Sequence, residues 1–101
     1  MPKQRAYVYK ETKGIDSYRV YPPVVVLGQG DQFELVNLSG DPAALTVKAG
    51  VFGGAVQQNI PHGQGSGIKV AGNAAIAAEY KVVVKGKDAQ GNSDPVIIID
   101  L

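Results

Sequence analysis

The side chains with the most evident chemical potential in this chain are one histidine and several tyrosines. His62 is the only imidazole among the 101 residues. An imidazole at this position could serve as the general base of a small hydrolase or isomerase. Such a base needs an orienting partner, and Asp41, Asp31 and Ser66 are the candidates. Because His62 stands beside glycine in a turn-rich loop, the simpler interpretation is an exposed surface residue, and no catalytic set is predicted.

The tyrosines gather near the start of the chain. Tyr7, Tyr9, Tyr18 and Tyr21 all precede the first proline pair. A tyrosine ring buries apolar area while its hydroxyl stays polar, so a cluster can bind a protein or a sugar. The absence of tryptophan argues against the sugar. These four residues are the candidate binding residues, and core or edge packing in β-type runs is the alternative interpretation.

Other motifs point to no further chemistry. Residues 63–67 are glycine-rich like a phosphate loop, but residues 68–70 have a strand pattern where a helix is needed. Asp88, Asp94 and Asp100 do not have the spacing of a calcium loop. The chain contains no cysteine, which excludes disulfides, cysteine-type zinc sites and thiolate nucleophiles. We predict neither a metal site nor a cofactor.

Composition limits the partners. The formal net charge is +1, so nothing favours nucleic acid or an anionic membrane surface. No apolar run approaches the roughly 18 residues of a membrane span. The first residues, Met-Pro-Lys-Gln-Arg, lack the apolar segment of a secretory signal. The sequence leaves the localisation open, with a periplasmic or secreted protein expected if a signal had been removed.

Short β-strands are the elements that must position these side chains. Residues 79–101 contain two strongly apolar, β-branched runs around a polar loop at 86–94, and we predict both runs as central strands. Further strands are expected over 6–10, 18–21, 24–27, 32–38, 43–48, 55–58 and 68–70. The Gly-Gln-Gly-Asp turn at 28–31 predicts a hairpin of 24–27 with 32–38. Asn73 could cap a single helical turn that reaches Ala78.

This pattern predicts one all-β domain over residues 1–101, with residues 1–17 as an N-terminal arm or an edge strand. Seven or eight short strands with turns at regular spacing are typical of a Greek-key β-sandwich. The expected core residues are Val24, Val26, Phe33, Leu35, Leu45, Val47, Ile68, Val70, Tyr80, Val82, Val84, Ile97 and Ile99.

Several segments, taken in order, resemble the cupredoxin family of blue copper proteins. Residues 24–37 resemble its strand, Gly-Asp turn, strand and Asn signature. Residues 39–42 (Ser-Gly-Asp-Pro) match the loop before its first copper histidine, and residues 60–66 resemble its Pro-x-Gly turn. Residues 80–84 lie where the family has Tyr-x-Tyr/Phe-x-Cys. The resemblance covers roughly residues 20–101 and implies a cupredoxin-like sandwich, with an immunoglobulin-like sandwich as the nearest competitor.

The resemblance does not extend to the copper site. Type 1 copper needs a cysteine thiolate, two histidines and usually a distant methionine. By register, Val84 occupies the cysteine position and Leu45 or Ala44 the position of the first histidine. The loop at 86–94 contains neither histidine nor methionine. The resemblance therefore implies a cupredoxin-like scaffold without copper.

The function expected from these observations is a non-catalytic binding or assembly module. Contacts with a protein partner or with further copies of the chain would use the tyrosine-rich N-terminal region and a sheet edge. Two alternatives stay open at this stage: a small enzyme that uses His62, and a divergent metal-binding protein.

Overall fold

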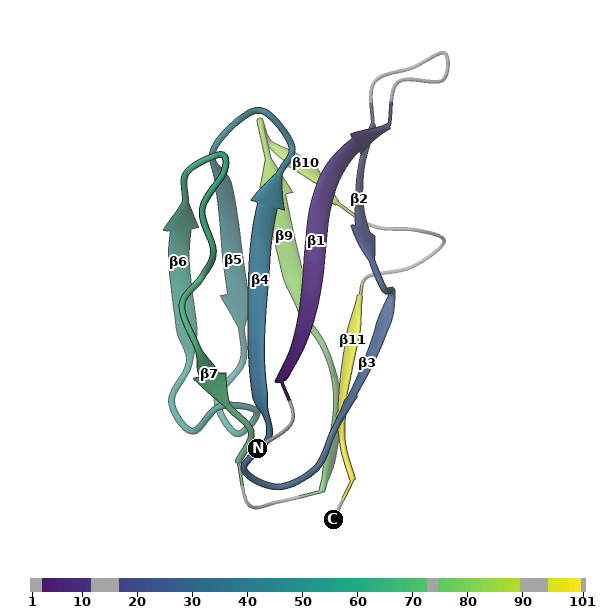
Figure 1. The fold of residues 1–101 in the computed structure, drawn as a ribbon, viewed down its shortest axis with the longest axis vertical. Coiled ribbons are helices and arrows are strands. Elements are labelled where there is room, and N and C mark those ends of the chain that lie inside the picture. The colour runs from purple at the N-terminus through teal and green to yellow at the C-terminus, as the bar shows by residue number, and fades with distance from the viewer. Residues whose placement is uncertain (1–2, 12–16, 73–74, 90–94, 101) are drawn as a thin grey trace.

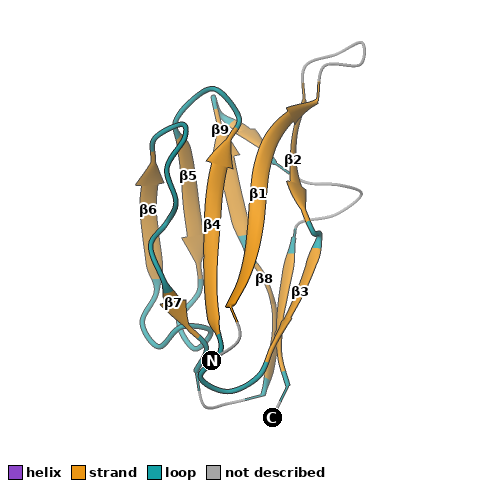
Figure 2. Ribbon diagram, in the orientation of Figure 1, coloured by secondary structure: helices purple, strands orange, loops and turns teal. Residues whose placement is uncertain are grey.

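The computed structural model describes residues 3–11, 17–72, 75–89 and 95–100, and among these residues it contains strands and no helix (Figure 2). No described helix could therefore cross a membrane. The strands are β1 (Lys3–Glu11), β2 (Ser17–Tyr21), β3 (Val24–Leu27), β4 (Gln32–Leu38), β5 (Ala43–Val47), β6 (Val56–Ile60), β7 (Lys69–Val70), β8 (Ile76–Glu79), β9 (Lys81–Val84), β10 (Lys87–Asp88) and β11 (Val96–Ile99).

The strands form two layers (Figure 1). One sheet has the order β2-β1-β4-β7, and a second sheet, with the order β10-β9-β5-β6, packs behind it. A smaller sheet, β3-β11-β8, extends the sandwich at the end where the chain terminates. The predicted all-β sandwich is confirmed, and so are the central positions of β9 and β11.

The core lies between the layers and is built largely from alternate residues of the longer strands, while β7 and β10 contribute no buried residue. Nine predicted core residues are buried, each at most 2% exposed: Phe33, Leu35, Leu45, Val47, Tyr80, Val82, Val84, Ile97 and Ile99. Burial of each large apolar side chain contributes about 1.5–3 kcal/mol. Phe33 is at the centre of an aromatic group, stacked on Phe52 at 5.6 Å and edge-on to Tyr80 at 6.1 Å.

Four predicted core residues are instead exposed. Val24, Val26, Ile68 and Val70 are 48%, 53%, 45% and 52% exposed, whereas Val25 and Leu27 are buried. All four residues of β3 are apolar, so no alternation in the sequence indicates which face turns inward. In β7, Val70 pairs with Gln32 of β4, one residue before the buried Phe33.

The predicted hairpin is wrong, because its two strands belong to different sheets. β3 pairs in parallel with β11, and β4 pairs in parallel with β1. The turn itself forms as expected: Gly28 N donates to Asp31 Oδ2 at 2.8 Å, and Gly30 has a φ of 77°. The turn therefore carries the chain from one sheet to another.

The N-terminal segment and the predicted helical turn also differ from expectation. β1 is neither an arm nor an edge strand, since it lies between β2 and β4. β8 (Ile76–Glu79) replaces the helical turn and pairs antiparallel with β11. Asn73 and the next residue lie outside the described residues. In the polar loop, residues 87–88 form β10, and residues 90–94 lie outside the described part.

Candidate functional site

The end of the sandwich where copper would lie in the related fold is lined by apolar side chains. Val84 on β9 pairs with Ala43 on β5, which also pairs with Ile60 on β6. All three residues are at most 1% exposed. Leu45, one of the two residues expected at the first histidine position, pairs with Val82 instead, and Ala44 pairs with Val83. This row contains no metal-ligating atom.

We call this end of the sandwich the pole. Two loops, residues 38–42 and 60–66, lie there, and Asn37 connects them. Its side chain is fully buried, and Nδ2 donates to Asp41 O at 2.7 Å and to Ile60 O at 2.8 Å. Its Oδ1 accepts from Ser39 N at 2.9 Å and from the Ser39 hydroxyl at 2.6 Å. The backbone of Asn37 also bonds Gly63 and Gln64. One amide therefore connects two loops that are distant in the sequence.

His62 takes part in this connection and not in a catalytic set. Its Nδ1 accepts a hydrogen bond from Gly40 N at 2.9 Å in an exposed setting. The proposed partners are engaged elsewhere. The Asp41 carboxylate accepts from the Tyr18 hydroxyl at 3.4 Å and lies 3.7 Å from Lys85 Nζ.

The two other proposed partners of His62 have structural contacts of their own. The Asp31 carboxylate accepts from Gly28 N within its turn. The Ser66 hydroxyl accepts from Leu35 N at 3.0 Å and donates to Gly67 O at 2.9 Å. The imidazole of His62 therefore connects the two loops of the pole and has no catalytic partner among these three residues.

The donor atoms at the pole do not suit a copper ion. Type 1 copper needs a thiolate and two imidazoles, but the chain has no cysteine and a single histidine. Among the described residues, no group of three or more His, Cys, Asp or Glu side chains could hold a metal ion. We derive no redox or metal-assisted step for this site.

A shallow depression of about 420 Å³ lies over β5 and β6, lined by Ala44, Leu45, Thr46, Gln57, Gln58 and Asn59. None of these side chains titrates, so the depression lacks a general acid or base. Its polar groups are amides and one hydroxyl. The depression therefore offers hydrogen bonds but no catalytic chemistry.

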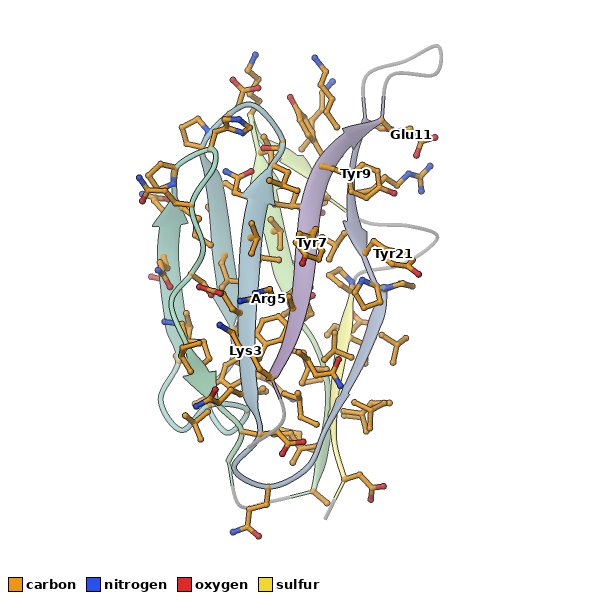
Figure 3. All side chains as sticks on the ribbon, viewed as in Figure 1. Lys3, Arg5, Tyr7, Tyr9, Glu11 and Tyr21 are labelled. Carbon is orange, nitrogen blue, oxygen red and sulfur yellow. The ribbon has the colours of Figure 1, made fainter. Side chains whose placement is uncertain are left out.

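Three of the four predicted tyrosines lie together on the outer face of the first sheet (Figure 3). Tyr7 on β1 pairs directly with Tyr21 on β2, and Tyr9 follows Tyr7 on the same face of β1. Their exposed fractions are 36% for Tyr7, 37% for Tyr9 and 63% for Tyr21. The fourth, Tyr18, is 4% exposed and belongs to the core. The structure therefore brings together Tyr7, Tyr9 and Tyr21 and separates Tyr18 from them.

Two aliphatic residues of β4 extend this surface. The parallel pairing of β1 with β4 sets Val36 beside Tyr7 and Leu38 beside Tyr9. Leu38 is 49% exposed, and Val36 is half-buried. We name the surface of Tyr7, Tyr9, Tyr21, Val36 and Leu38 the tyrosine face. The sequence did not reveal the aliphatic part, because a parallel neighbour distant in the chain leaves no local pattern.

Charged pairs border the tyrosine face at both ends of β1. Arg19 Nε lies 2.8 Å from Glu11 Oε2 at one end. At the other end, Glu34 Oε1 lies 3.4 Å from Lys3 Nζ and 3.5 Å from Arg5 Nε. Lys3, Arg5, Tyr7, Tyr9 and Glu11 follow one another along the same side of the strand (Figure 3). The surface thus has an aromatic centre and an ionic rim.

Comparison with known proteins identifies the fold. Neither a family model nor a curated protein matches the chain. Among solved structures, a Cu(I) methionine-to-glutamine variant of amicyanin aligns with a TM-score of 0.63 and 14% identity, over 97% of this chain and 82% of amicyanin. An oxidised proline-to-glycine variant gives 0.62, and a reduced tryptophan-to-tyrosine variant gives 0.60. Both are 14% identical and align over 93% of this chain and 80% of amicyanin.

These likenesses, together with the strand arrangement, define the class: a cupredoxin-like β-sandwich. Within that class, this chain lacks the copper ligands, since Val84 and Ala43 face each other at the pole and cysteine is absent. The predicted resemblance is confirmed at the level of the fold. At this identity the likeness assigns no activity.

Proposed function

We propose that this protein is a non-catalytic binding or assembly module that contacts a partner protein through the tyrosine face. The observation that carries the proposal is the exposure of Tyr7, Tyr9 and Tyr21 on one face of two paired strands. Isolated exposed apolar residues are ordinary on a protein surface, whereas a contiguous aromatic group is typical of a contact site.

The composition of the tyrosine face fits a protein partner. Tyrosine is enriched at interface hot spots because its rigid ring buries a large area at a small entropic cost. The charged pairs around it correspond to the polar rim that surrounds the apolar centre of most interfaces. The expected partner therefore has an apolar centre and a polar rim of its own.

The scaffold also favours binding through this face. β1 lies between β2 and β4, so Tyr7 and Tyr9 sit on backbone that is hydrogen-bonded on both sides, and Tyr21 lies on the neighbouring edge strand β2. A rigid platform lowers the ordering cost of binding. No specific observation favours an enzyme, because the single imidazole is bonded to a backbone amide.

Point substitutions test this proposal better than deletion of residues 1–17, which would remove the central strand β1. The test variant is Tyr7→Thr/Tyr9→Thr/Tyr21→Thr, because threonine suits a strand but lacks the ring. Lys81→Thr/Val83→Thr, on the outer face of the second sheet, is the matched control. Affinity capture with the unaltered chain would supply the partner, and calorimetry with the purified partner would give the dissociation constants.

We expect the triple tyrosine variant to bind at least about thirtyfold more weakly, since loss of a hot spot costs about 2 kcal/mol. The control variant should bind like the unaltered chain. Circular dichroism of both variants checks that the fold is kept. Equal affinity of the three proteins would rule out the tyrosine face as the contact site.

A further inference from the structure

β6 presents an edge that no described strand covers. Within the sheet of order β10-β9-β5-β6, β5 is its only bonded neighbour. Among the described residues, β6 has no backbone hydrogen bond to a segment on its outer side. On the inner side, Gln58 Nε2 donates to Ser66 O at 2.8 Å and ties β6 to the other layer. Apart from Ile60 O, which accepts from Asn37 Nδ2 at 2.8 Å, no described hydrogen bond occupies the outer N–H and C=O groups of β6, and these groups can pair.

This edge lacks the features that usually prevent strands from pairing between molecules. Its sequence, Val-Gln-Gln-Asn-Ile, has no charged residue and no proline. Proteins commonly protect an edge with lysine, proline, a bulge or a very short strand. Other edges here show such features. β7 and β10 have two residues each, and both include lysine; β8 ends in Glu79, and β3 directly follows two prolines.

The sequence of β6 suits pairing with itself in the antiparallel direction. Pro61 has no N–H and limits the ladder to Val56–Ile60. The register that uses all five residues of both copies sets Gln58 opposite Gln58 and Gln57 opposite Asn59. Gln57 and Asn59 are exposed, and their amides can donate to and accept from one another. No like charges would face each other.

We propose that β6 of one copy pairs antiparallel with β6 of a second copy, with the twofold axis at Gln58, to join two four-stranded sheets into one. This dimer is independent of the tyrosine face, which lies on the other layer. It goes beyond the binding function proposed above because it makes each assembly bivalent. Two tyrosine faces on one dimer would raise the avidity for a clustered partner.

Disulfide trapping tests the register, because the chain has no cysteine of its own. Gln57→Cys and Asn59→Cys are made separately and oxidised with diamide, alone and as an equimolar mixture. Directly opposite residues have Cα atoms about 4.5–5.5 Å apart, within reach of a disulfide. The offset positions in each variant alone lie roughly 8 Å or more apart, beyond that reach.

The mixture should form severalfold more covalent dimer than either variant alone, and sedimentation equilibrium should show a reversible dimer of the unaltered chain. Equal crosslinking in all three samples, or a monomer up to millimolar concentration, would overturn the proposal. The triple tyrosine variant should dimerise normally. Loss of its dimer would place the contact on the tyrosine face and refute edge pairing. An unaltered chain that dimerises normally but binds no partner would refute only the binding function.

Charge substitutions on the same two positions give a second test with its own control. Gln57→Lys/Asn59→Lys sets lysines opposite each other twice and should leave a folded monomer. Gln57→Lys/Asn59→Glu sets opposite charges in the same places and should keep the dimer. Retention of the dimer by both double variants would contradict the proposed register.

Discussion

Asn37 connects two loops at one end of the molecule through hydrogen bonds alone. All of its side-chain polar atoms are bonded inside the protein, to Asp41 O, Ile60 O and Ser39. A fully satisfied buried amide stabilises one loop arrangement, whereas a partly satisfied one is costly. The hydrogen bonds of Asn37 therefore organise the pole together with the bond from Gly40 N to His62 Nδ1.

Asn37→Ala should lower the free energy of unfolding by about 3 kcal/mol, because it leaves several buried backbone groups without partners. Gln4→Ala is the control: loss of an amide at an exposed position of β1 should alter stability by less than about 0.5 kcal/mol. Urea denaturation at micromolar concentration measures both variants. A loss of under about 1 kcal/mol for Asn37→Ala would show that water replaces these bonds.

Among the strands, β3 illustrates which information the sequence contains and which it lacks. Four consecutive β-branched or aliphatic residues predict a strand, and a strand forms. The face that it buries depends on its parallel pairing with β11, some seventy residues further along the chain. A strand without polar residues has no alternation from which to infer that face. The expected core therefore contained Val24 and Val26 in place of Val25 and Leu27.

Identical substitutions at two adjacent positions of β3 test which face of the strand is buried. Val25 is 2% exposed and Val24 is 48% exposed. Val25→Ala should lower the free energy of unfolding by about 2 kcal/mol, since it removes buried methyl groups and leaves a small cavity. Val24→Ala should cost less than about 0.5 kcal/mol. Denaturant titration of both variants measures the difference, and equal or reversed effects would contradict the observed register.

For the molecule as a whole, the order of short strands and turns predicted the sandwich, while several strand pairings were not predictable. The two parallel pairings, β1 with β4 and β3 with β11, bring distant segments together and have no local signature. The pairing of β1 with β4 also helps to define the tyrosine face. The clustering in the sequence indicated Tyr7, Tyr9, Tyr18 and Tyr21. The structure excludes Tyr18, because its side chain is buried in the core, and the parallel pairing adds Val36 and Leu38.

The absence of a copper ligand set from this cupredoxin-like sandwich leads to a prediction about metal binding. A single imidazole, already bonded to Gly40 N, is a poor site, because stable sites generally need about three or four protein ligands. Calorimetric titration with copper(II) or zinc should give only weak, non-saturating heat at micromolar concentration. His62→Ala should reduce that heat to the level of dilution. A saturable one-to-one isotherm that survives His62→Ala would mean that other groups form a metal site, and the assignment of a copper-free scaffold would fail.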